Sequence, residues 1–130
     1  DDLLNSLMTA SAHSVFVFGL YLIVQGSILV FGPNILLELV GIQPSTEVWV
    51  RITGFAVFVL GYYYIGNARA GLQSFFKLTV HIRIVQFFFF LVLVLLEMAE
   101  AMLLAFAAVE LLSGLWTLLC LKREGAYSGD

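Results

Sequence analysis

Charged residues are scarce in this chain: Asp, Glu, Lys and Arg make up 12% of its 130 residues, whereas 62% are hydrophobic. The mean hydropathy is +1.03, which lies far outside the range of water-soluble domains. These values exclude a soluble domain whose apolar residues merely form a core. The net charge of −3 and the lack of a basic aromatic patch argue against a nucleic-acid partner.

Several reactive arrangements are missing as well. Cys120 is the one cysteine, which excludes an internal disulfide and a CxxC redox pair. No serine has a suitable histidine and acid nearby, and there is no glycine-rich phosphate loop. Glu97 and Glu100 lie one turn apart and make a weak metal site without further ligands, so we expect no metal. These absences favour a protein that is not an enzyme.

What the chain does have is four long apolar stretches. Each approaches the roughly 20 residues that a helix needs to cross a bilayer. The runs are continuous, as in Phe87–Leu96, and therefore lack the alternation of a barrel strand. The sequence predicts one all-α domain, an antiparallel bundle of four transmembrane helices. The predicted spans are residues 12–31, 48–68, 76–96 and 101–121.

The connection after the first span contains helical signals of its own. Pro33 suits the first turn of a helix, and Ile35, Leu36 and Leu39 recur at helical spacing. We therefore predict a short interfacial helix over residues 34–41. It is either a lid over the bundle or an amphipathic connector that lies among the lipid headgroups.

The break between the last two spans has no turn residue to mark it. No Gly or Pro occurs between Phe75 and Ser113, so propensity alone would allow one continuous helix. At about 1.5 Å per residue, such a helix would be far longer than a bilayer is thick. We therefore expect a break near residues 97–100.

Basic residues define the expected orientation. Five of the six Lys and Arg residues fall near one face of the predicted bundle, and Arg51 is the exception. By the positive-inside rule that face is cytoplasmic, and an even number of spans places both termini there. The five residues are Arg69, Lys77, Arg83, Lys122 and Arg123.

Small residues recur along three of the spans. Such faces allow close backbone contact between membrane helices, so we expect them at helix contacts within the bundle. They are Gly19 and Gly26 in the first span, Gly54 and Gly61 in the second, and Ala101, Ala105 and Ala108 in the fourth.

Polar residues inside the spans are the candidate ligand or proton-coupling residues. We expect them to point inward, because polar side chains are costly in lipid. Glu110, near the middle of the fourth span, is either neutral and hydrogen-bonded to Gln86 or ionised and bridged to Arg51 with help from Gln25 or Tyr21. The complete set is Tyr21, Gln25, Arg51, Tyr62, Arg83, Gln86 and Glu110.

Two histidines raise the question of haem. His13 and His81 fall near the same ends of helices that run in the same direction, so they are candidate ligands of one haem b iron. The alternative is a pair of interfacial imidazoles that make ordinary hydrogen bonds. We favour that alternative and expect no cofactor.

Several segments resemble small bacterial four-helix membrane proteins of the DoxX-like or BphX-like type. The resemblance implies residence in the bacterial inner (plasma) membrane and carries no catalytic residue to this chain. The segments are Phe31–Asn34, Glu47–Arg51, Tyr62–Tyr64, Asn67–Arg69 and Leu115–Thr117.

Three function classes follow from these patterns. The first is a non-enzymatic membrane component, an accessory or structural subunit or a self-associating bundle, whose polar residues fix helix register. The second is a small oligomeric proton-coupled transporter or channel that uses Glu110; a bundle this small would need a second copy to form an aqueous route. A haem-bearing or lipid-modifying enzyme is the third. The expected partners are the lipid bilayer and a second copy or a larger membrane complex.

Overall fold

The computed structural model describes residues 8–39, 41–44 and 48–127, and this part of the chain is helical with no strand. The four long helices are each long and apolar enough to cross a membrane. The predicted all-α architecture of four membrane helices with a short helix after the first is therefore confirmed. The helices are α2 (Ala10–Phe31), α3 (Pro33–Leu39), α4 (Val48–Ala70), α5 (Gln73–Leu95) and α6 (Leu103–Arg123).

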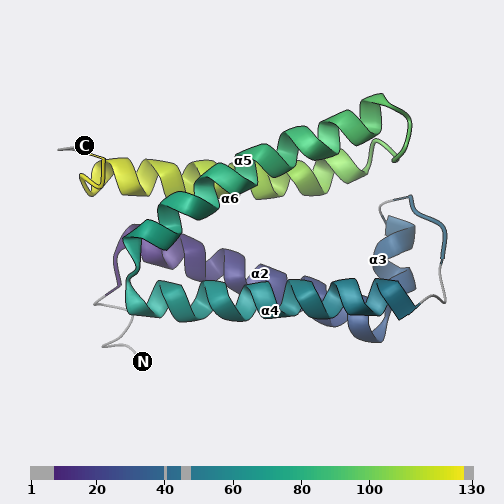
Figure 1. The fold of residues 1–130 in the computed structure, drawn as a ribbon, viewed down its shortest axis with the longest axis horizontal. Helices are drawn as coiled ribbons and strands as arrows, with labels where there is room; N and C mark the ends of the chain where they lie inside the picture. The colour runs from purple at the N-terminus through teal and green to yellow at the C-terminus, as the bar shows by residue number, and fades with distance from the viewer. Residues whose placement is uncertain (1–7, 40, 45–47, 128–130) are drawn as a thin grey trace.

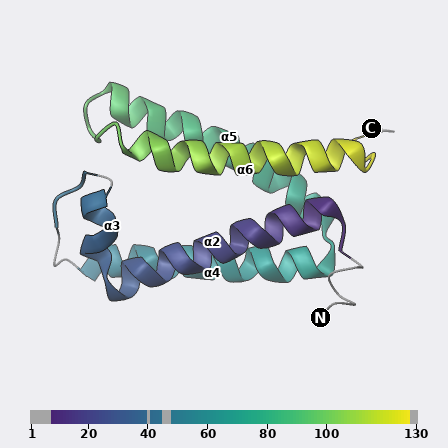
Figure 2. The same cartoon turned by 180° about the vertical axis from the view of Figure 1, so that it is seen from behind.

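The helices are arranged as two antiparallel pairs (Figures 1 and 2). α2 packs along α4, and α5 packs along α6; α2 also contacts α6, whereas the backbone of α4 approaches those of α5 and α6 at few points. The Tyr64 ring of α4 contacts the Phe75 ring of α5. The two pairs meet at the end where α2 begins and α6 ends, here called the terminal end. They separate toward the opposite end, the α3 end, where α3 lies across the opening.

The α2–α4 pair is held together by glycines. A Cβ atom at Gly26 would lie 2.5 Å from the Phe58 nitrogen, and one at Gly61 would lie 2.8 Å from the Gly19 carbonyl oxygen. The two backbones are thus too close for any side chain at these positions. The predicted close contacts of Gly19, Gly26, Gly54 and Gly61 are confirmed.

The alanine stripe predicted on the fourth span is wrong. Ala101 and Ala105 are exposed, while Ala107 is fully buried. The inward face of α6 continues from Ala107 through Glu110 and Gly114. Polar and glycine contacts with α5 therefore set the rotation of α6.

The helix ends explain the break that had no turn residue. α4 is followed by Gly71, which has a positive φ of 67° and belongs to a Schellman motif, in which two backbone hydrogen bonds close the last turn of the helix. α5 ends in the same motif with Glu97 at φ 60°: the Glu97 N–H donates to the Val94 carbonyl and the Met98 N–H to the Leu93 carbonyl. The break predicted near residues 97–100 is confirmed, and a glutamate occupies the position that usually belongs to glycine.

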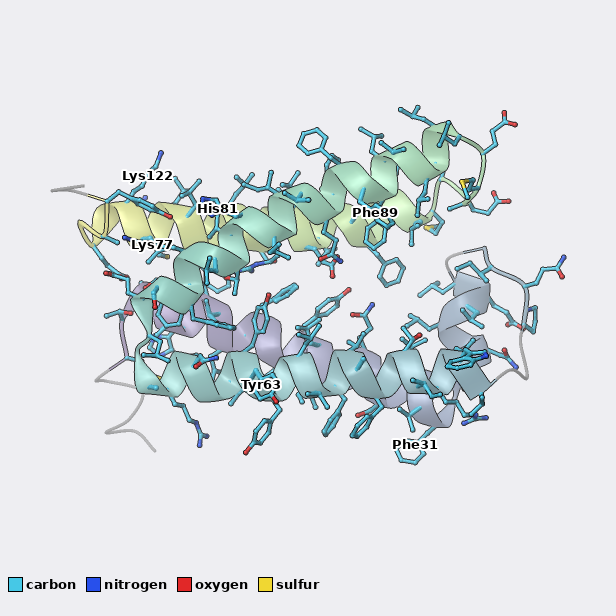
Figure 3. All side chains as sticks on the ribbon, in the orientation of Figure 1. Phe31, Tyr63, Lys77, His81, Phe89 and Lys122 are labelled. Atoms are coloured by element: carbon cyan, nitrogen blue, oxygen red, sulfur yellow. The ribbon has the colours of Figure 1, made fainter. Side chains whose placement is uncertain are left out.

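The tightly packed core lies in the terminal half of the bundle. It includes Val15, Phe18, Phe76, Val80 and Leu121, none of them more than 5% exposed. The outer faces carry large apolar side chains instead. Phe31, which is 84% exposed, and Tyr63 project from the α2–α4 pair on the side away from α5 and α6 (Figure 3). An apolar exterior is what helices in contact with lipid require.

Candidate functional site

A buried arginine lies at the centre of a polar cluster between α5 and α6. Arg83 is 1% exposed. Its Nη2 donates to the Thr79 hydroxyl at 2.9 Å and the Thr117 hydroxyl at 3.2 Å, its Nη1 donates to the Ser113 hydroxyl at 3.1 Å, and its Nε donates to the Thr79 carbonyl at 3.3 Å. All its hydrogen-bond partners among the described residues are uncharged. A Cβ at Gly114 would lie 3.2 Å from the Arg83 Cβ, so the glycine makes room for the arginine stem.

The cluster extends from Arg83 to the terminal end and joins α2 to α6. The Thr117 and Ser14 hydroxyls lie 2.7 Å apart, and Ser14 also donates to the Ser11 carbonyl at 2.7 Å. Glu124, just after α6, accepts from the Ser11 hydroxyl at 2.6 Å and the Ser11 backbone N–H at 2.9 Å. Ser11, Ser14 and Glu124 were not predicted from the sequence. The two serines have one sequence signal, a hydroxyl side chain in the first turns of an apolar span, whereas Glu124 has none.

Above this cluster lies a cavity of about 460 Å³ that all five helices line. Its base is formed by Phe18 and Tyr64; the Arg83 guanidinium carbon lies 4.6 Å from the centre of the Phe18 ring. Leu36 and Leu37 of α3 line its α3 end. α3 therefore covers part of the cavity.

The walls of the cavity are mainly apolar, with few polar groups. Leu22, Val57, Phe90 and Phe106 contribute apolar side chains from four different helices. The polar residues in the lining are Gln25, Thr53, Tyr64, Gln86 and Glu110. A concave apolar surface with a few convergent polar groups is typical of a small-molecule site.

Glu110 faces this cavity. Its Oε2 accepts a hydrogen bond from the Gln86 amide at 2.6 Å, whereas no described residue donates to its Oε1. Oε1 is not fully buried, and Glu110 is part of the cavity lining. Glu110 also interacts electrostatically with Arg83, although the two side chains form no hydrogen bond.

Helix geometry explains why Gln86 is the partner. Gln86 lies 13 residues after the start of α5, and Glu110 lies 13 residues before the end of α6. At about 1.5 Å per residue, both are about 20 Å from the terminal end. The predicted hydrogen bond between them is present.

The predicted bridge between Glu110 and Arg51 is wrong. Arg51 is exposed, and its Nη1 donates to the Val30 carbonyl at the end of α2. Tyr62 is also exposed rather than inward-facing. The physical reason is that α4 must turn Gly54 and Gly61 toward α2, which places Arg51 and Tyr62 on the outside of the bundle.

Tyr21 and Gln25 follow one another along α2. Gln25 lines the cavity. The Tyr21 hydroxyl is buried, and within the described part of the chain it is the buried side-chain atom without a hydrogen-bond partner. Glu110 acts on it electrostatically, so an unsatisfied hydroxyl and a half-satisfied carboxylate lie in the same region of the bundle.

The two histidines have different surroundings. His13 is half-buried, and its Nδ1 lies 3.1 Å from the Thr9 carbonyl oxygen, whereas His81 is exposed. His81, Lys77 and Lys122 all lie in the terminal half of the bundle (Figure 3). Haem binding stays a prediction. Among residues 8–39, 41–44 and 48–127, no group of three His, Cys, Asp or Glu residues could hold a metal ion.

Comparisons with models of protein families, with curated proteins and with solved structures find no match. The resemblance to DoxX-like and BphX-like proteins therefore stays a prediction. The function has to be argued from the geometry of the site.

Proposed function

We propose that this integral membrane protein is not an enzyme and that it binds a lipophilic molecule in the cavity between its two helix pairs. The observation that carries the proposal is the cavity of about 460 Å³ with Glu110 in its wall. This volume falls within the roughly 300–1,000 Å³ of small-molecule sites. Its apolar walls favour a ligand that arrives from lipid over one that arrives from water.

The arrangement of the helices supports a route from the bilayer. Residues of α4 and α5 both line the cavity, yet the backbones of these two helices come close at few points. The Tyr64 ring of α4 contacts the Phe75 ring of α5 at the base of the cavity. Apolar side chains such as Val57 of α4 and Ile82 of α5 border the cavity on that side. Acyl chains of the surrounding lipid would therefore meet the cavity between α4 and α5.

The polar residues divide into two groups with different roles. Arg83, Ser14 and Thr117 link α2, α5 and α6 by hydrogen bonds, which fixes the register of these helices. That is the structural role expected of a membrane subunit. Glu110 lines the cavity and has one oxygen without a donor among the described residues, so it is available to a ligand. The proposal therefore keeps the structural class for the Arg83 cluster and assigns binding to the cavity.

Binding is tested with 1-aminoanthracene, an apolar fluorescent probe, titrated into the protein in a nonionic detergent. The wild type should bind one probe molecule with a saturable rise in fluorescence. Val57→Phe and Leu29→Phe, which add bulk to two different walls, should abolish saturation. Val92→Phe is the matched control, because Val92 is 49% exposed and lies outside the cavity lining. Equal, non-saturable partitioning in all four proteins would refute the proposal.

The proposed setting is the bacterial inner membrane, with both chain termini in the cytoplasm. The terminal end carries Arg69, Lys77, Lys122 and Arg123, which supports this orientation by the positive-inside rule. A membrane-impermeant maleimide on intact cells should label Glu100→Cys and spare Gly125→Cys, each in a Cys120→Ser background. The reverse pattern would invert the orientation.

A second candidate is proton-coupled transport by an oligomer of this chain. It is favoured by the free Glu110 oxygen, which could take up and release a proton at the cavity wall. In proteoliposomes, Glu110→Gln would then abolish the movement of protons that the wild type shows. Proton movement that is equal in wild type, variant and empty liposomes would leave ligand binding as the function.

A further inference from the structure

We infer that the cavity selects an amphiphile with one apolar chain and a hydrogen-bond-donating head, an amine or a hydroxyl, and that it rejects acidic heads. This inference rests on the proposed function and names the ligand class of the same site. It follows from the charge and the hydrogen-bonding state of the cavity wall. Of the residues in the lining, Glu110 alone is acidic or basic.

The carboxylate can accept one more hydrogen bond from inside the cavity. Gln86 donates to the Glu110 Oε2, whereas Oε1 is not fully buried and has no donor among the described residues, and Glu110 lines the cavity. A head with an N–H or O–H group would supply the missing donor. An ionised carboxylate or phosphate head has no N–H or O–H to donate and would instead place its oxygens against the Glu110 oxygen, where electrostatic repulsion is strong in a medium of low dielectric constant.

The nearby arginine does not reverse this preference. Arg83 is 1% exposed and is not part of the cavity lining. The Phe18 ring packs on its guanidinium group and also lines the cavity, and the arginine N–H groups already donate to Thr79, Ser113 and Thr117. Arg83 therefore cannot pair with an acidic head. Its charge partly balances Glu110 from a distance, which lets a neutral hydroxyl bind as well as an amine.

The depth of Glu110 fixes where the two parts of the ligand lie. Glu110 is seven residues after the start of α6, about 10 Å from the α3 end at 1.5 Å per residue. The head would bind at that depth. The tail would lie along apolar walls that include Leu29, Phe90 and Phe106, beneath α3 or between α4 and α5.

The test is displacement of bound 1-aminoanthracene by three compounds with the same twelve-carbon chain: dodecylamine, dodecanol and laurate. Concentrations are expressed as mole fraction in the nonionic detergent, so that partitioning does not enter the comparison. Dodecylamine and dodecanol should displace the probe at mole fractions at least tenfold lower than laurate. Equal displacement by laurate would overturn the inference while leaving the proposed function standing. Failure of the probe itself to bind would overturn both.

Variants of Glu110 provide an independent test of the same inference. Glu110→Gln keeps a partner for Gln86 but loses the acidic acceptor, so the advantage of dodecylamine over laurate should fall by about tenfold. The displacement is expressed relative to the affinity of each variant for 1-aminoanthracene, whose own amine can donate to Glu110. Glu110→Asp should keep the advantage. Native mass spectrometry of the same samples reports bound ligand and stoichiometry. A protein that retains none of the three compounds, as a monomer or as a dimer, would contradict the inference.

Discussion

The substitution Gly26→Ala tests the fold most sharply, because Gly26 lies where α2 and α4 approach each other most closely. The new Cβ would stand 2.5 Å from the Phe58 nitrogen and 2.6 Å from the Gly54 carbonyl oxygen. Ordinary contact begins at about 3.4 Å, so the two backbones would have to separate by about 0.9 Å. Both obstructing atoms belong to the backbone and cannot rotate away.

Overpacking a well-packed contact generally lowers protein stability by about 1–3 kcal/mol. Replacing glycine by alanine within a helix also stabilises the helix by up to about 1 kcal/mol, because alanine has the higher helix propensity. Gly66→Ala is the matched control, because a Cβ there would meet nothing within 4 Å. Gly26→Ala should therefore be about 2 kcal/mol less stable than Gly66→Ala.

The assay is unfolding in mixed micelles of dodecyl maltoside and SDS, followed by the fluorescence of Trp49 and Trp116. Gly54→Ala should behave like Gly26→Ala, and the double variant should cost less than the two single costs combined, since both act at the same helix crossing. Equal stability of Gly26→Ala and Gly66→Ala would refute the reasoning, because it would mean that α2 and α4 do not approach closely at Gly26.

Three further substitutions test other contacts by the same unfolding assay. Glu97→Gly should stabilise the protein by about 1 kcal/mol. Glu97 has φ 60°, a left-handed conformation that costs residues other than glycine about 1–2 kcal/mol. If Glu97→Gly is no more stable than Glu97→Ala, this explanation is wrong. Tyr21→Phe should stabilise the protein by about 1 kcal/mol, because it removes a buried hydroxyl without a partner. The exposed control Tyr63→Phe should be neutral. A loss of stability in Tyr21→Phe would mean that the Tyr21 hydroxyl makes a hydrogen bond. Glu124→Ala should lower the stability by about 1 kcal/mol, because the Glu124 carboxylate caps the start of α2 at Ser11. A loss of stability no larger than that of the exposed control Glu100→Ala would argue against the cap.

The architecture could be predicted because it depends on length and hydropathy. Four apolar runs long enough to cross a bilayer leave few alternatives, and the seven-residue glycine spacing of Gly19 with Gly26 and Gly54 with Gly61 marked the α2–α4 contact. The pairing of Gln86 with Glu110 could also be predicted, since helix rise alone places the two side chains at one depth.

The rotation of α4 could not be predicted, because two signals on that helix conflict. Polarity favoured an inward face with Arg51 and Tyr62, whereas small size favoured one with Gly54 and Gly61. The glycine face packs inward. Without a hydrophobic driving force between helices in lipid, close backbone packing determines the contact. Arg51 could still lie outside because it is near the helix end, where its side chain reaches the Val30 carbonyl.

The cavity could not be predicted from the sequence either. It exists because α4 and α5, although joined by a short turn, diverge from the terminal end (Figure 1). That divergence depends on the polar cluster around Arg83, which draws α2, α5 and α6 together at one end. Its members Ser11, Ser14 and Glu124 come from opposite ends of the chain, so no local pattern could reveal them.

The central claim is that the Glu110 carboxyl group faces an apolar cavity inside the membrane, and its reactivity tests this directly. A lipophilic carbodiimide, dicyclohexylcarbodiimide, should modify Glu110 in the membrane-embedded protein at mildly acidic pH, as read from peptide masses. A water-soluble carbodiimide should react only with carboxylates outside the spans, and Val57→Phe should protect Glu110 from the lipophilic reagent. If Glu110 stays unmodified under conditions that modify it in the SDS-unfolded protein, or if the water-soluble reagent reaches it equally well, the cavity is not the apolar site described here.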